Sequence, residues 1–182
     1  AAPGDALITV IESLLEQTTP DLGPGSRAGV RRVVHGTTLI TNTLIERRGA
    51  RTALVVTQGT RDVLDIAREL RYDTYDLGIE YPIPLVPVED RYELAERLGP
   101  AGQVWRRLAT ADLKGLVGKV AAGKYDAVAV CLLHASVDDR HERAVAKALS
   151  ARLKGVPVST SAEVAREIGE YERMSTVVAN AY

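Results

Sequence analysis

Short apolar segments alternate along this chain with segments of helical periodicity, and this alternation limits the fold more than any other feature. In the helical segments, apolar residues recur at intervals of about three to four residues, which places them on one face. Repeated alternation of this kind predicts an α/β domain with a mainly parallel sheet and helices on both faces. The predicted strands are residues 31–35, 53–57, 127–133 and 156–159.

The low aromatic content supports the same prediction. The chain has no Phe, and aromatic residues make up 4% of it, so Val, Leu, Ile and Ala must form the core. Aliphatic cores suit parallel strands that are covered on both faces. Residues 127–133 form the most apolar of the predicted strands, and we expect this strand to be central.

Capping residues and apolar spacing locate the helices. Asp5 can begin the first helix, which Pro20 would end. Further helices are expected over residues 39–48 and 61–70, after Asp112, from Asp138 or Asp139 to Leu153, and from Ser161 through Glu172.

Residues from about 72 to 108 interrupt the alternation. Closely spaced prolines at 82, 84 and 87 lack backbone donors and impose extended backbone, which predicts a connector. Residues 90–95 and 103–108 flank a glycine-containing turn, so we expect them to pair as a small surface β-hairpin. Trp105 is expected to cover the inner face of this hairpin. We interpret residues 1–182 as one domain with this excursion.

The charge balance and the cysteine content exclude several classes of function. Lys plus Arg total 23 and Asp plus Glu total 24, so the net charge of -1 provides no basic field for nucleic acid or anionic lipid. We expect neither as a partner. Cys131 is the only cysteine, which rules out an intrachain disulfide and indicates a cytoplasmic protein. Inside an apolar strand, its thiol should be inert, with a raised pKa.

Both ends of the chain suggest a longer protein. The chain begins at Ala1, although its one methionine is Met174. Residues 177–182 are mainly apolar and contain neither Gly nor Pro as a helix stop signal. We therefore expect the chain to be a piece of a larger polypeptide.

The most informative local motif is the turn between the first predicted strand and its helix. His35, Gly36, Thr37 and Thr38 bring backbone amides and hydroxyl groups to a helix N-terminus, where the macrodipole favours a phosphate or a carboxylate. Asn42 lies one helical turn beyond Thr38 and can point the same way. Two interpretations stay open, an anion site or a threonine cap on a simple glycine turn. His35 is either a proton carrier or an ordinary hydrogen-bonding residue.

Other polar residues give less specific signals. Arg61 follows the second predicted strand, where it either holds an anion or pairs with Asp62 or Asp65. His141 and Glu142 are expected on the solvated surface of a helix. The histidine spacing contains no zinc motif, so we assign no metal ligands to this chain.

Several short motifs follow one another in a fixed order. They are His35-Gly36-Thr37-Thr38 with Thr41-Asn42, residues 44–54, Gly59-Thr60-Arg61-Asp62-Val63-Leu64, Tyr75-Asp76-Leu77, Ala127 to His134, His141-Glu142-Arg143, and Glu170 to Thr176. Each motif is weak alone, but their shared order makes chance similarity improbable. Together they resemble the hydantoinase/oxoprolinase family, in particular the N-terminal region of hydantoinase A.

The resemblance implies part of a large ATP-dependent enzyme, with half of an actin-like, ribonuclease H-like ATPase superfamily fold. Such enzymes open cyclic amides, such as hydantoins or 5-oxoproline, after phosphorylating the carbonyl oxygen with ATP and a divalent cation such as Mg²⁺. No cofactor is expected on the isolated piece. Two alternatives stay open: a domain of an ATP-dependent acetone-type carboxylase subunit, or a non-catalytic scaffold that docks a partner subunit.

The same resemblance implies roles for individual residues. His35 and Asn42 become catalytic candidates. Phosphate or substrate binding is implied for Gly36, Thr37, Thr38, Thr41, Arg61, Arg173, Ser175 and Thr176. The implied partners are the remainder of the same chain, a hydantoinase B-type subunit or domain, and a small cyclic-amide substrate.

One feature of the family is absent from this sequence. Family members carry a glycine-rich Asp-Xaa-Gly-Gly-Thr phosphate hairpin, and no segment here matches it. We therefore expect the isolated chain to be catalytically inactive. If the opening strands of the family's fold are missing from this chain, one edge of the sheet is left uncovered. An uncovered edge would also favour self-association.

Overall fold

The structure is a computed structural model, and it describes residues 8–14, 38–70, 75–76 and 78–182. Residues 8–14 are helical and belong to a unit formed by residues 1–39. Apart from Leu39, which begins one helix, the other elements lie in a second unit, residues 40–182, which is described by itself below. The predicted strand at 31–35 lies outside the described residues.

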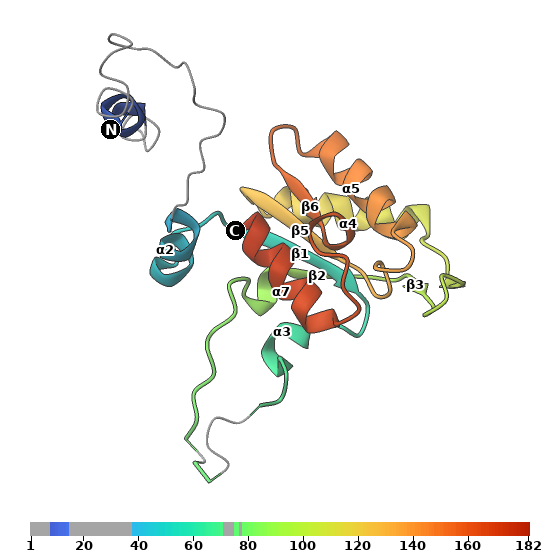
Figure 1. Cartoon of the computed structure of the whole chain (residues 1–182). Coiled ribbons are helices and arrows are strands. Elements are labelled where there is room, and N and C mark those ends of the chain that lie inside the picture. The colour runs from blue at the N-terminus through green and yellow to red at the C-terminus, as the bar shows by residue number, and fades with distance from the viewer. Residues whose placement is uncertain (1–7, 15–37, 71–74, 77) are drawn as a thin grey trace. The chain divides into compact units, whose positions relative to one another are not determined.

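A four-stranded parallel sheet forms the centre of the second unit (Figure 1). Strand β1 (Thr52–Thr57) lies between β2 (Arg91–Leu94) and β5 (Ala127–Cys131), and β6 (Val158–Thr160) pairs with the other side of β5. Every residue of β1 and β5 is buried, as expected for strands covered on both faces. This arrangement confirms the predicted mainly parallel sheet and the central position of the strand that begins at Ala127.

Helices cover both faces of this sheet, as the sequence predicts. Helices α4 (Thr110–Ala122) and α5 (Arg140–Arg152) pack on one face. Helix α7 (Glu170–Ala181), with the short helices α3 (Val63–Ile66) and α6 (Ser161–Val164), packs on the other face. In the described ranges, no helix has both the length and the apolar character needed to cross a bilayer.

Side-chain alternation along the strands builds two separate cores. In β1, Ala53 and Val55 join the core beneath α4 and α5, whereas Leu54 and Val56 join the core beneath α7. Leu149 of α5 is fully buried in the first core. Because both faces of β1 are apolar, the sheet needs helices on both sides to exclude water.

Two helices are shorter than the sequence indicates. Over residues 61–70, α3 is a single turn, because Ala67 has a φ of 50°, which an α-helix does not allow. Over residues 161–172, the chain leaves helical geometry at Ala165, where φ is -151°, and α7 begins after Gly169. Apolar spacing reports which side of a segment is buried, but it does not reveal a backbone break between buried positions.

The predicted hairpin is partly wrong. Residues 91–94 form β2 and pair in parallel with β1, and the hairpin instead joins β3 (Arg97–Leu98) to β4 (Val104–Arg106). The physical reason is that Leu94 is buried in the core beneath α4 and α5, a position that a surface hairpin does not provide. Trp105 is 61% exposed, so it does not cover an inner face.

We predict that Leu149→Ala lowers the free energy of unfolding by about 3 kcal/mol, because it removes a fully buried side chain and leaves a cavity. The control Lys147→Ala, at an exposed position of the same helix, should change it by less than about 0.5 kcal/mol. Urea denaturation measures both values. Equal effects would contradict the assignment of Leu149 to the core.

Candidate functional site

Buried polar side chains gather beyond the carboxyl ends of the parallel strands. In open parallel sheets, this edge is where ligands bind. Strand β1 ends at Thr57 and β5 at Cys131, and the backbone just after β5 connects two networks of charged and hydroxyl groups. The buried members of these networks are Thr57, Glu96, His141, Glu142, Ser161 and Arg173. This edge is the candidate functional site.

The first network joins Thr57, Glu96 and His141. The Leu133 amide donates to Oγ1 of Thr57 at 2.9 Å, and the Thr57 hydroxyl donates to Oε1 of Glu96. The other carboxylate oxygen, Oε2 of Glu96, lies 2.6 Å from Nδ1 of His141. Because a carboxylate accepts hydrogen bonds, this contact places the imidazole proton on Nδ1.

This arrangement leaves Nε2 as the reactive nitrogen of His141. Among the described residues, none forms a hydrogen bond with Nε2, and the His141 side chain is 9% exposed. A histidine that a buried carboxylate orients can accept a proton at Nε2 and return it. The first network can therefore support proton transfer at this edge of the sheet.

The second network is centred on Glu142, which is completely buried. Its Oε1 accepts hydrogen bonds from the Leu132 amide at 2.8 Å and from Oγ of Ser161 at 2.6 Å. Its Oε2 accepts from the Ala162 amide at 3.0 Å. Burial raises the pKa of this carboxyl, although the three donors and Arg173 oppose the shift. Glu142 thereby connects the end of β5 to the beginning of α6.

Arg173 completes the second network and is also fully buried. Its Nε donates to Oγ of Ser161 at 3.0 Å. Its terminal nitrogens donate to the carbonyls of Leu132 at 2.8 Å and Glu167 at 3.1 Å, and to Oε2 of Glu170 at 2.5 Å. All three guanidinium nitrogens are engaged within the protein, so a phosphate could contact Arg173 only by replacing these bonds.

The other two candidates on α7 lie in different surroundings. Oγ of Ser175 donates to the Glu172 carbonyl at 3.1 Å, which ties the hydroxyl to its own helix. Thr176 is exposed, whereas Arg173 is enclosed in the interior. Helix α7 therefore does not present the three predicted phosphate-binding residues on one surface.

His141 and Glu142 do not lie on a solvated helix surface, so the expectation from the sequence is wrong for both residues. Both are buried, with exposed fractions of 7% and 0%. The residue spacing does indicate this burial, since His141, Val145 and Leu149 recur at intervals of four on one helix face. The polar residue types concealed this signal, because a buried face is usually inferred from apolar residues alone.

The turn that was predicted to bind an anion lies mainly outside the described residues. The roles proposed for His35, Gly36 and Thr37 therefore remain predictions. Thr38 is exposed, and so are Thr41 and Asn42 on helix α2 (Leu39–Glu46). Exposure leaves these three polar side chains accessible to a ligand.

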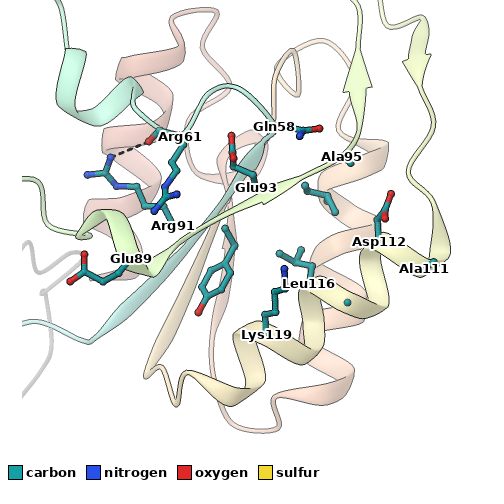
Figure 2. Close-up of a pocket in the computed structure, with 13 residues that line it drawn as sticks. Gln58, Arg61, Glu89, Arg91, Glu93, Ala95, Ala111, Asp112, Leu116 and Lys119 are labelled. Atoms are coloured by element: carbon teal, nitrogen blue, oxygen red, sulfur yellow. Dashed lines mark hydrogen bonds between the residues drawn. The ribbon is translucent and has the colours of Figure 1, made fainter.

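Arg61 lines an open pocket of about 600 Å³ between the edge strand β2 and helix α4 (Figure 2). One terminal nitrogen donates to the Val88 carbonyl at 2.6 Å, and Nε is buried without a hydrogen-bond partner in the described part of the chain. Within the same part, Arg61 forms no ion pair with Asp62 or Asp65, and Asp65 instead binds Arg91. Arg61 remains a candidate for anion binding.

The described residues do not fit a site for a nucleoside triphosphate and its metal ion. Over these ranges, no three His, Cys, Asp or Glu side chains lie close enough together to hold a metal. The sequence also contains no glycine-rich Asp-Xaa-Gly-Gly-Thr phosphate hairpin. No catalytic step through a bound nucleotide or metal is therefore assigned to these residues.

Comparison with known proteins identifies the family. The family described as "Hydantoinase/oxoprolinase N-terminal region" matches residues 1–153. This chain belongs to the hydantoinase/oxoprolinase family. The resemblance in the ordered motifs is thereby confirmed. An uncharacterized protein of Methanocaldococcus jannaschii is 35% identical to this family member over an alignment of 153 residues, which covers 82% of this chain and 22% of that protein.

Two relatives have named activities. The 5-oxoprolinase of Saccharomyces cerevisiae is 28% identical over 206 residues, covering 100% of this chain and 16% of that enzyme. The acetophenone carboxylase gamma subunit of Aromatoleum aromaticum is 29% identical over 161 residues, covering 81% of this chain and 22% of that subunit. This family member thus spans between 16% and 22% of the length of these relatives.

A solved structure supports the fold assignment. The crystal structure of the ATP-dependent caprolactamase from Pseudomonas jessenii matches this family member with a TM-score of 0.80 and 29% sequence identity. The match covers 95% of this chain and 26% of the caprolactamase chain. The mainly parallel α/β fold is therefore shared with part of this caprolactamase.

Glu142→Ala should lower the free energy of unfolding by about 3 kcal/mol, because it leaves the buried amides of Leu132 and Ala162 without an acceptor and removes a buried negative charge that interacts with Arg173. Glu163→Ala, at an exposed position on α6, is the matched control and should cost less than about 0.5 kcal/mol. Urea denaturation compares the two. A loss as small as that of the control would show that Glu142 does not hold this edge together.

Cys131 should be unreactive in the folded chain. Cys131 is buried, and burial raises the pKa of its thiol to about 12, in the direction expected from the sequence. At pH 8 we expect 5,5′-dithiobis(2-nitrobenzoate) to label Cys131 only as fast as the chain unfolds, and rapidly in urea. Ser150→Cys adds a thiol at an exposed position and should react at once in native buffer. Equally fast labelling of both thiols would contradict the buried position of Cys131.

Proposed function

We propose that this chain is part of an ATP-dependent enzyme that opens a cyclic amide ring of the hydantoin or 5-oxoproline type. The observation that carries the proposal is the similarity to the ATP-dependent caprolactamase over nearly the whole chain. The similarity to a 5-oxoprolinase supports the same class of substrate, since caprolactam and 5-oxoproline are both lactams.

The proposed reaction activates the ring carbonyl by phosphorylation. Resonance protects a ring amide from water, and its nitrogen is a poor leaving group. Transfer of the γ-phosphoryl group of ATP to the carbonyl oxygen makes the carbon electrophilic. Water then adds to this carbon, and the ring C–N bond breaks as the nitrogen takes a proton, which leaves an acyl phosphate. A second water attacks the acyl carbon, and inorganic phosphate leaves with the original carbonyl oxygen, so both oxygens of the new carboxylate come from water. Stabilising charge on the transferred phosphoryl group is the main demand on the protein.

Residues of this chain can serve the proton transfers and the binding of anionic groups. His141, oriented by Glu96, can take a proton from the attacking water or give one to the ring nitrogen through Nε2. His35 and Asn42 stay in the proposal as catalytic candidates. The proposed phosphate and substrate contacts are Gly36, Thr37, Thr38, Thr41 and Arg61.

The complete enzyme is proposed to need more than this chain. We assign the remaining domains to the rest of a longer polypeptide and to a hydantoinase B-type subunit. ATP and a divalent cation, Mg²⁺ in our proposal, would bind to that assembly. A cytoplasmic location, which the single cysteine indicated, is part of the same proposal.

A second candidate function is that of a domain in an ATP-dependent carboxylase. The observation in its favour is the acetophenone carboxylase gamma subunit, which is as similar to this chain as the 5-oxoprolinase is. In that reaction, an activated carbonyl compound would meet carbon derived from carboxyphosphate, whereas water is the acceptor in the hydrolase.

The proposed reaction predicts that the ring carbonyl oxygen ends in phosphate. The test uses this sequence within a polypeptide of full family length, produced together with a hydantoinase B-type subunit. Given ATP and hydantoin, 5-oxoproline or caprolactam with an isotopically labelled carbonyl oxygen, it should release labelled phosphate and the ring-opened acid. The 182-residue chain alone should release neither.

Two results would contradict these expectations. ATP hydrolysis that requires a ketone and bicarbonate, without ring opening, would replace the hydrolase with the carboxylase candidate. Ring opening by the 182-residue chain alone would contradict the predicted inactivity of the isolated chain.

A further inference from the structure

Two arginines of the β-hairpin face each other without a carboxylate partner in the described ranges. Arg97 of β3 and Arg106 of β4 are directly opposite in the antiparallel pair. Like charges at directly opposite positions destabilise paired strands. The repulsion within this pair therefore destabilises the fold. No described acidic side chain offsets it through an ion pair.

Both guanidinium groups contact one residue, Gln58, in the turn that follows β1. A terminal nitrogen of Arg97 donates to the Gln58 carbonyl at 3.2 Å. A terminal nitrogen of Arg106 donates to Oε1 of Gln58 at 2.9 Å. Because both contacts end on the same residue, the two charged groups converge. Each contact uses one nitrogen, so further donors of both guanidinium groups remain available.

A β-bulge sets this geometry. Arg97 is opposite Arg106, but Leu98 is opposite Val104, so Trp105 has no partner in the register. Bulges redirect side chains and occur frequently beside functional sites. Here the extra residue places Arg106 across from Arg97.

The arginine pair lies at the edge of the sheet where ligands are expected. Gln58 directly follows β1, at the carboxyl end of a central parallel strand. The nearby carboxylate of Glu93 accepts a hydrogen bond from the Gly59 amide at 2.7 Å. Glu93 is therefore directed at the backbone of the turn, and it forms no ion pair with either arginine among the described side chains.

We propose that Arg97 and Arg106 form a binding site for an oxyanion, either a phosphate or a carboxylate group. Converging guanidinium groups match the paired oxygens of both anions. A bound anion would also remove the repulsion between the two arginines. The site goes beyond the proposed function, because anion binding by this chain does not depend on which reaction the longer enzyme catalyses.

Fluorescence titration of the 182-residue chain tests the site, with inorganic phosphate and acetate added separately at constant ionic strength. Trp105 is the only tryptophan and adjoins Arg106, so its emission reports on the hairpin. We expect a saturable change. Saturation by phosphate alone identifies a phosphoryl site, by acetate alone a carboxylate site, and by both a general oxyanion site. A response that fails to saturate with either anion overturns the proposal.

Matched variants separate this site from general charge attraction. Arg97→Gln and Arg106→Gln should each weaken anion affinity by about tenfold, the value of one lost charge-assisted contact. Arg107→Gln removes the same charge from the exposed neighbouring position and should change the affinity by less than about twofold. Equal losses in all three variants would overturn the site.

Thermal unfolding provides a second readout that a purely structural role would not produce. Without added anion, Arg106→Gln should keep or raise the unfolding temperature, because it relieves the repulsion with Arg97. The anion that saturates the fluorescence should stabilise the original chain more than this variant. A lower unfolding temperature for Arg106→Gln, with no anion effect on either protein, would show that the pair serves the fold alone.

Discussion

The carboxyl edge of the sheet depends on one buried carboxylate, that of Glu142. This side chain on α5 accepts hydrogen bonds from the end of β5 and the beginning of α6, and it shares Ser161 with Arg173 of α7. Each donor would be buried without a partner if the carboxylate were absent, so the contacts depend on one another. The same segment after β5 contributes the Leu133 amide to Thr57, which extends this fixed geometry to the network of His141.

Most of the sheet could be predicted from the sequence, because the spacing of apolar residues directly reflects burial. Apolar spacing does not identify strand β2. It is four residues long and contains Arg91 and Glu93, so its pattern fits a surface hairpin as well as a sheet. In the structure a distant partner decides between the two, since the buried Arg91 side chain binds Asp65, 26 residues earlier in the chain. Contacts of this kind do not appear in local periodicity.

The candidate site was harder to predict than the fold, because its buried charged residues resemble surface residues in the sequence. Glu96 lies between the buried Leu94 and Leu98 at alternating positions, which indicates the same burial, yet its charge argues for solvent. A buried charge is identified by its partner, and Glu96 and His141 are 45 residues apart. Sheet topology brings them together, and no local pattern of residues displays that pairing.

The buried networks and the arginine pair differ in how their charges are satisfied, and this difference bears on function. Arg173 uses all three guanidinium nitrogens within the protein, so its contacts stabilise the native fold and leave little for a ligand. Arg97 and Arg106 retain unused donors and repel each other, so their net contribution to the stability of the fold is small. Local departures from stabilising chemistry are expected mainly at functional positions. An uncompensated charge at the ligand-binding edge is therefore a better guide to binding than a buried, fully bonded one.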